Sequence, residues 1–162
     1  MLRPIFAFLE FLFEEVETYQ LALSVVLGIF LGLVPFLTLQ WWFSFGFVLF
    51  FRLNLATTLF SFFTFSILGL AIEPYLNNLG NFFLTGIPRL IPIWAWMYHV
   101  PIIPYTGFNN TYVFGSTLIA LVLAVPIFFL MFYFIKRYRS NLFHLWKETK
   151  LSRYYAYYKR FN

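Results

Sequence analysis

Cysteine and aspartate are both absent from the 162 residues of the chain. Without cysteine there is no disulfide, thiol nucleophile or thiolate metal ligand. The sequence also lacks a Ser-His-acid set, a Gly-rich phosphate loop and any histidine and carboxylate cluster with metal-site spacing. We therefore expect no enzyme activity, no catalytic residue, no bound metal and no cofactor.

Charge is scarce as well. Charged residues make up 10% of the sequence, whereas an ordinary soluble domain is about 25% charged. Hydrophobic residues make up 62%, and a chain of this size cannot bury 25 Phe, 11 Tyr and 5 Trp inside a soluble core. The apolar runs are continuous and do not alternate as the strands of a membrane barrel do. The sequence therefore predicts an all-α integral membrane protein.

The apolar and broken segments divide this single membrane domain, residues 1–162, into six parts. Apolar runs predict spans, prolines break a segment, and aromatic residues suit the headgroup layer. The parts are an amphipathic interfacial helix at 4–18, a long apolar run at 20–51, a span at 53–72, a Pro-broken extracytoplasmic interfacial region at 74–110, a span at 111–135 and a basic tail at 136–162.

The basic residues predict the orientation. Eight of the eleven Lys and Arg lie at or after Lys136, at the end of the last span. Because Lys and Arg concentrate in cytoplasmic segments, we expect the C-terminus to be cytoplasmic. Region 74–110 is then extracytoplasmic, and Arg52 lies on the cytoplasmic side. A basic segment beside a span also indicates an anionic membrane surface rather than nucleic acid as the partner.

The uncharged run from Leu21 to Phe51 is too long for one span, which needs about 20 residues. Its halves, 20–33 and 38–51, would each rise about 21 Å as α-helices, which is less than the hydrocarbon core of about 30 Å. We favour a re-entrant hairpin, which puts both ends of the run and the N-terminus in the cytoplasm. One long kinked helix is the alternative, and it would put the N-terminus outside.

Small and polar residues cluster at the centre of this run. Gly28 and Gly32 form a GxxxG pattern, which lets two helix backbones approach closely. Pro35 would make the hairpin turn, and Gln40 would pair with backbone groups that the turn frees from the helices. The plainer alternatives are ordinary helix packing for the glycines and a capping role for the polar side chains near the turn.

Two groups outside the turn are candidate contact sites. Arg52, Asn54 and Arg89 are candidates for contact with lipid headgroups, because Arg pairs well with phosphate oxygens. The alternative is an interfacial Arg52 with Asn54 as a helix cap. The candidates for docking a partner are in the aromatic extracytoplasmic region: Trp94, Trp96, Tyr98, Asn109 and Asn110.

Four stretches also resemble a known family. QLALSVVLGIFLGLVP (Gln20 to Pro35), RLNL (Arg52 to Leu55), Glu73-Pro74 and FNNTYVFGS (Phe108 to Ser116) are similar to the bacterial membrane family called domain of unknown function 2062, in its small stand-alone subfamily. The resemblance implies the inner membrane of bacteria that have an outer membrane, and a gene paired with a larger protein. It implies no activity, catalytic residue or ligand.

Three functions follow as hypotheses. The first is an inner-membrane subunit that anchors and assists a larger envelope partner in moving phospholipid toward the outer membrane, with membrane lipids and that protein as its partners. The alternative is a small-solute or ion channel or transporter made of oligomerised hairpins, lined by Thr38, Gln40 and Thr64. The third is a scaffold that only holds its partner at the membrane.

Overall fold

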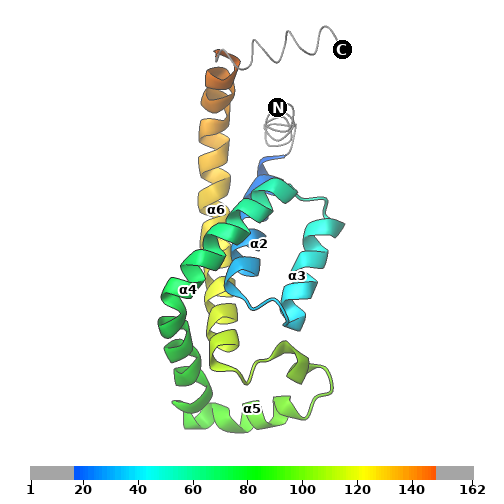
Figure 1. The fold of residues 1–162 in the computed structure, drawn as a ribbon, viewed down its shortest axis with the longest axis vertical. Helices are drawn as coiled ribbons and strands as arrows, with labels where there is room; N and C mark the ends of the chain where they lie inside the picture. Colours follow the sequence, from blue (N-terminus) through cyan, green and yellow to red (C-terminus); the bar gives the residue numbers. More distant parts are fainter. Residues whose placement is uncertain (1–16, 149–162) are drawn as a thin grey trace.

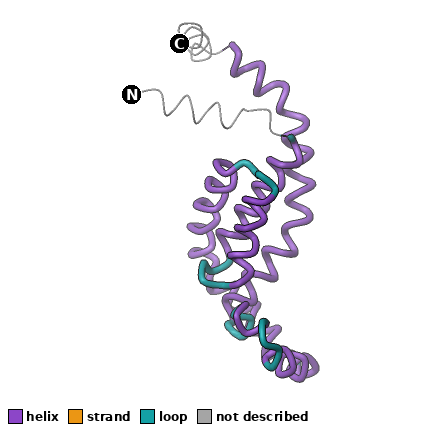
Figure 2. Tube along the Cα trace, turned by 90° about the vertical axis from the view of Figure 1, so that its right-hand side faces the viewer, coloured by secondary structure: helices purple, strands orange, loops and turns teal. Residues whose placement is uncertain are grey.

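A computed structural model of the chain describes residues 17–148, which form helices joined by short loops (Figure 1, Figure 2). No strand occurs in this part, in agreement with the expected all-α class. The elements are α2 (Thr18–Leu33), α3 (Leu39–Phe50), α4 (Leu55–Thr85), the 3-10 helix η1 (Pro88–Leu90), α5 (Ile91–Tyr98), the 3-10 helix η2 (Ile103–Thr106) and α6 (Thr111–Glu148).

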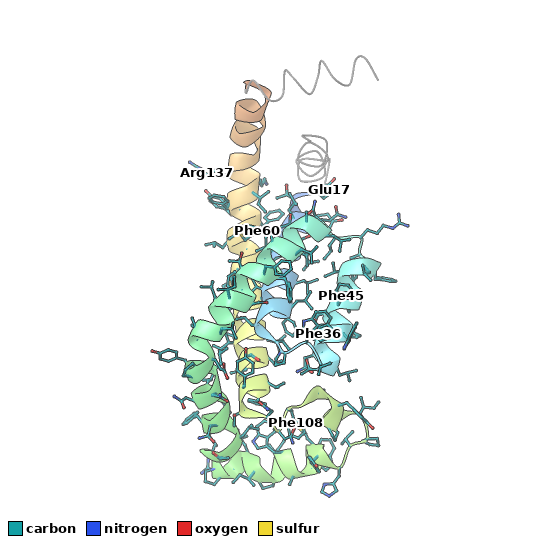
Figure 3. All side chains as sticks on the ribbon, in the orientation of Figure 1. Glu17, Phe36, Phe45, Phe60, Phe108 and Arg137 are labelled. Carbon is teal, nitrogen blue, oxygen red and sulfur yellow. The ribbon has the colours of Figure 1, made fainter. Side chains whose placement is uncertain are left out.

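Three helices form the body of the molecule. α2 lies between α4 and α6 and contacts both, while α4 and α6 also contact each other. α3 turns back beside α2, and α5 lies across the end of the bundle (Figure 1). Glu17 and Arg137 lie toward one end of the molecule, and Phe108 lies near the other (Figure 3).

The hydrophobic core is drawn mainly from α2. Four of its residues, Ile29, Phe30, Leu31 and Leu33, are buried in one cluster with the following Val34. Trp41, Val48, Leu53 and Ala120 complete this cluster from the other elements. These side chains pack against one another where α2 meets the other elements.

Two helices are long and apolar enough to cross a membrane, α4 and the Thr111–Arg137 part of α6. Only 6% of the most apolar stretch of α6 and 22% of that of α4 are buried. The core helix of a soluble protein would be mostly buried, so the low values matter here. Large apolar side chains instead cover the outside of α6, including Leu121, Val122, Val125 and Phe129. Such a surface needs an apolar environment.

α4 corrects the expected segment boundaries. The sequence analysis ended this span at residue 72 and assigned 74–110 to short interfacial pieces, but α4 runs through Pro74 to Thr85. Proline removes one hydrogen bond and bends a helix without ending it when neighbours hold both sides. Here the later part of α4 is held by α6, since Thr111 Oγ1 donates a hydrogen bond of 2.6 Å to Asn77 Oδ1.

Two glycines bring the same part of α4 against α6. A Cβ atom added to Gly80 would collide with the Thr111 carbonyl, and one added to Gly115 would collide with the Leu76 carbonyl. Only glycine permits this approach of the two backbones. The contact explains why the helix persists where its sequence alone indicates a break.

The remaining boundaries differ less. The run 20–51 forms two helices, α2 and α3, with a turn between them. α6 continues beyond the expected span at 111–135 as far as Glu148. The expected interfacial helix at 4–18 lies outside the described residues except for its last two, and residues 149–162 of the expected basic tail lie outside them too.

Candidate functional site

α2, the first arm of the hairpin, packs against α4, and this contact depends on glycine. A Cβ added to Gly28 would lie 2.5 Å from Ser61 Cβ and 2.5 Å from the Thr58 carbonyl oxygen. A Cβ added to Gly32 would lie 2.7 Å from the Phe62 carbonyl oxygen. Real Cβ atoms essentially never come closer than 3.0 Å to such atoms. Both glycines therefore lie where the α2 and α4 backbones touch.

A buried polar cluster continues this contact toward the start of α4. Ser24, one helical turn before Gly28, is fully buried, and its hydroxyl donates to the Gln20 carbonyl at 2.7 Å. The Ser24 hydroxyl also accepts the backbone N–H of Asn54 at 3.0 Å. Thr58 Oγ1 donates to the Asn54 carbonyl at 3.0 Å. The cluster joins the beginning of α2 to the beginning of α4.

Asn54 is a helix cap. Its side-chain Oδ1 accepts the Thr57 N–H at 2.8 Å, and the residue is only 5% exposed. A side-chain oxygen at this position satisfies one of the donors left over at a helix N-terminus. The burial and the cap correspond to the alternative that the sequence left open, and they leave the Asn54 side chain without access to a lipid headgroup.

Arg52 occupies the turn between α3 and α4 with a φ of 48°. The Leu53 N–H donates to the Val48 carbonyl at 3.0 Å and the Arg52 N–H to the Leu49 carbonyl at 3.2 Å, which is the Schellman pattern. Its left-handed position usually holds glycine, because a side chain there costs about 1–2 kcal/mol. The Arg52 side chain is exposed, so a cation is presented at this end of the hairpin.

Arg89 lies far from Arg52. It belongs to η1, which follows the end of α4, whereas Arg52 precedes the start of α4. The 31 residues of α4 rise about 46 Å if straight, although the helix bends. Arg89 is also exposed. The two arginines therefore belong to opposite ends of the molecule and do not form one headgroup site.

The turn at Pro35 is closed by local hydrogen bonds. Thr38 donates to the Pro35 carbonyl twice, from its backbone N–H at 3.2 Å and from Oγ1 at 2.9 Å. The Val34 N–H donates to the Phe30 carbonyl at 3.0 Å, which ends α2. Pro35 begins the turn as expected from its fixed φ and its missing donor.

Two aromatic side chains satisfy the last carbonyl groups of α2. The Trp41 indole N–H donates to the Leu31 carbonyl at 3.0 Å, and the Tyr112 hydroxyl donates to the Leu33 carbonyl at 3.2 Å. We expected Gln40 to pair with freed backbone groups, and this expectation is corrected. The prediction considered only polar residues as partners for the turn. It overlooked Trp and Tyr, whose apolar rings each carry one hydrogen-bond donor.

Gln40 instead bonds to α6. Its Nε2 donates to Thr117 Oγ1 at 3.2 Å, while its Oε1 is buried without a hydrogen-bond partner in the described part of the chain. An apolar cavity of about 260 Å³ adjoins this contact. Its lining includes the polar Gln40, Thr106 and Thr117 and the apolar Phe108, Leu118 and Leu121. The sequence showed no signal for this cavity, since its walls are far apart in the chain.

The residues expected to dock a partner separate into two groups. The half-buried Trp94 donates its indole N–H to the Phe83 carbonyl at 3.1 Å, and Asn110 Oδ1 accepts the Tyr112 N–H at 2.9 Å as the cap of α6. Both side chains are occupied by hydrogen bonds to the backbone, that of Asn110 at an exposed position. Trp96 and Tyr98 are 67% and 57% exposed on α5, and Asn109 is exposed beside α6. The exposed three remain available to a partner.

No group of three His, Cys, Asp or Glu side chains within residues 17–148 could hold a metal ion. Arg52, Glu73 and Arg89 stand apart along the sequence, whereas Lys136 and Arg137 are adjacent in α6. What the site offers is therefore shape, apolar surface and hydrogen bonding.

The comparisons with known proteins give a relative without a described function. An uncharacterized protein of Treponema pallidum (strain Nichols) is 28% identical to this chain over 143 residues, which cover 88% of each protein. No protein-family model matches the chain, so its resemblance to domain of unknown function 2062 stays a prediction. No solved structure matches either. The chain is thus similar over most of its length to a bacterial protein, and its function must be argued from its own residues.

Proposed function

We propose that the chain is a multi-pass subunit of a bacterial inner membrane, with a cytoplasmic C-terminus, which anchors and assists a larger envelope partner in moving phospholipid toward the outer membrane. The observation that carries the proposal is the short hairpin of α2 and α3, placed beside two helices that are long and apolar enough to cross a membrane.

The arms of the hairpin are short for a bilayer. The 16 residues of α2 rise about 24 Å and the 12 residues of α3 about 18 Å, against a hydrocarbon core of about 30 Å. The bond between Asn54 and Ser24 keeps the two outer ends of the hairpin together. Glu17 and Arg52 then lie on one side of the membrane, and the hairpin re-enters from that side.

A hairpin that is shorter than the hydrocarbon core deforms the bilayer around it, and such a deformation helps lipid to move. Apolar helices shorter than the core are accommodated by local thinning of the membrane. The turn before α3 would expose Phe36 and Leu37 to lipid there, and α3 itself would expose Phe43 and Phe50. Thinning beside such a helix lowers the apolar distance that a lipid headgroup must cross. In this proposal the hairpin loosens the bilayer and the partner moves the lipid.

The extracytoplasmic region supplies the docking surface. α5 lies across the end of the bundle opposite Glu17 and Arg137, in the orientation of an interfacial helix (Figure 1, Figure 3). Trp96 and Tyr98 are exposed on it. Exposed aromatic side chains are frequent energetic anchors of protein interfaces. This surface therefore faces the compartment in which an envelope partner would extend.

Purification of the full chain tests the proposal. The tagged chain is extracted from its own membranes in a mild detergent, and co-purifying proteins and phospholipids are identified by mass spectrometry. We expect one larger envelope protein and retained phospholipid, with the protein lost in Trp96→Ala. Phe60→Ala is the matched control, because Phe60 is 72% exposed on α4, close to the other end of the molecule (Figure 3). A monomer with neither partner nor phospholipid would contradict the proposal.

The channel hypothesis has less support. The three polar side chains expected to line a pore already have partners in the chain: Thr38 donates to the Pro35 carbonyl, Gln40 to Thr117 and Thr64 to the Phe60 carbonyl at 2.8 Å. A pore needs polar groups that face a common path. We therefore do not carry this hypothesis further.

A further inference from the structure

The cavity beside Gln40 opens to the outside of the molecule. Leu121 lines it and is at the same time 59% exposed, so the cavity continues into the apolar outer surface of α6. Apolar cavities of about 150 Å³ in other proteins stay dry and take small apolar ligands. A cavity of about 260 Å³ that joins a lipid-facing surface therefore favours an apolar chain as its occupant over a cluster of water molecules.

The Gln40 amide also favours an occupant that carries one polar group. As assigned, Nε2 is paired with Thr117 and Oε1 has no partner in the described residues. With the amide turned over, Oε1 would accept from Thr117 and Nε2 would be the unpaired atom. A buried polar atom without a partner costs free energy in either orientation. An occupant that has an apolar body and a polar group at one end would remove this cost.

The depth of the cavity in the membrane indicates which kind of molecule occupies it. From Thr117 to Arg137, α6 rises about 30 Å, which equals the thickness of a hydrocarbon core. If Arg137 marks the cytoplasmic boundary, Thr117 and the bonded Gln40 lie near the opposite boundary, which the short hairpin reaches because the bilayer is thinned around it. The ester groups of phospholipids lie there, directly above their acyl chains.

We propose that this cavity holds the first part of one acyl chain of a phospholipid of the extracytoplasmic leaflet, with the ester group beside the Gln40 amide. The inference rests on the membrane placement in the proposed function and adds to it a specific lipid site between α3 and α6. A fluid lipid contacts every exposed apolar side chain, whereas this site would hold one lipid in one position.

The test uses the full chain in vesicles of phosphatidylethanolamine and phosphatidylglycerol. A phosphatidylethanolamine with a photoreactive diazirine close to its ester is included, and labelled peptides are mapped by mass spectrometry. Leu118→Trp fills the cavity without removing a hydrogen bond, and Val125→Trp adds the same ring to an exposed position of α6 that does not line the cavity. We expect label on the cavity walls, lowered about tenfold by Leu118→Trp and unchanged by Val125→Trp.

A second variant keeps the test decisive if Leu118→Trp does not fold. Gln40→Leu leaves the volume of the side chain nearly unchanged and removes the amide. We expect it to reduce labelling by the probe near the ester more than labelling by a second probe near the chain end. Equal reduction of both, or of neither, contradicts the assignment of the ester to Gln40.

Two further results would overturn the proposal. Equal labelling of the cavity walls in Leu118→Trp and Val125→Trp would mean fluid surrounding lipid only. Unlabelled cavity walls in a chain that forms a stable dimer would assign the cavity to an interface between two copies. Labelling of the cavity does not depend on co-purification of a partner. A filled cavity in a chain that has no partner would therefore support this site and contradict the proposed function alone.

Discussion

α2 and α3 are the two arms of one hairpin, both uncharged and rich in large apolar residues, yet the fold treats them differently. Eight residues of α2 are buried, but only Trp41 and Val48 of α3 are. α2 packs between α4 and α6, whereas α3 contacts mainly α2. Hydrophobicity alone does not decide which arm becomes the core.

The difference follows from side-chain size at helical spacing. α2 presents Ser24, Gly28 and Gly32 four residues apart on one face, and the backbone of α4 rests on that face. In α3 the only glycine is Gly46, and a Cβ added there would meet nothing within 4 Å. Between apolar helices in lipid, close packing replaces the hydrophobic effect as the force that joins them. Small residues therefore select the buried arm.

Exchange of one glycine in each arm should give the largest contrast. Gly28→Ala forces its methyl group against Ser61 and the Thr58 carbonyl, so we expect a loss of about 1–3 kcal/mol in unfolding free energy. Gly46→Ala has free space and improves helix propensity, so it should be neutral or stabilising by up to about 1 kcal/mol. Reversible unfolding in mixed micelles, followed by circular dichroism, measures both. Equal destabilisation by the two variants would contradict the difference in packing between α2 and α3.

We expect the second largest change in unfolding free energy at the buried polar cluster that joins the beginnings of α2 and α4. Asn54→Ala removes the cap on Thr57, and we expect a loss of about 1 kcal/mol, within the range of 0.5–2 kcal/mol for such caps. Asn109→Ala, at an exposed asparagine, serves as the control and should leave stability within 0.5 kcal/mol. The same unfolding assay applies. No loss in Asn54→Ala would show that the cap does not hold the start of α4.

Two adjacent tryptophans of α3 lie on different faces of the helix, Trp41 on the buried face and Trp42 on the exposed face. Trp41→Phe deletes the indole donor to the Leu31 carbonyl and should cost about 1 kcal/mol. Trp42, 51% exposed, makes no such bond in the described chain, so Trp42→Phe should change stability little. Their fluorescence adds a second readout, since lipid-soluble quenchers should reach Trp42 and spare Trp41. Equal quenching of both would contradict the packing described for α3.

The smallest expected effect is a gain. Arg52→Gly relieves the left-handed backbone at the end of α3, and the relief is partly offset by the flexibility of glycine in the unfolded chain. We expect a net stabilisation of up to about 1 kcal/mol in micelles. Arg89→Gly, in a residue with an ordinary φ, should bring no gain. A clear loss in Arg52→Gly would indicate that the arginine side chain itself holds the turn.

Much of this architecture could be predicted from residue patterns. The absence of charge between Thr18 and Phe51 marked the hairpin region, Pro35 marked its turn, and the spacing of Gly28 and Gly32 indicated a close helix contact. These features are local, so a pattern of a few residues is enough to show them. The placement of the helices in a membrane remains a prediction.

The features that escaped prediction depend on distant parts of the chain. Pro74 indicates a break, yet α4 continues because Gly80 of α4 and Gly115 of α6 let the two backbones touch. The helix α6 begins only at Thr111, 26 residues after Thr85. Gln40 looked like a partner for the turn, but its partner is Thr117. Neither contact has a signature within one segment, since each needs the packing of α6 to be known.

The central claim is that the hairpin enters and leaves on one side of the membrane, and the lack of cysteine in the chain makes it directly testable. Single variants Glu17→Cys, Arg52→Cys, Arg89→Cys and Arg137→Cys are labelled with a membrane-impermeant maleimide in intact and inside-out vesicles. The account predicts that positions 17, 52 and 137 react only from the cytoplasmic side, and position 89 only from the other side. Labelling of positions 17 and 52 from opposite sides would contradict it.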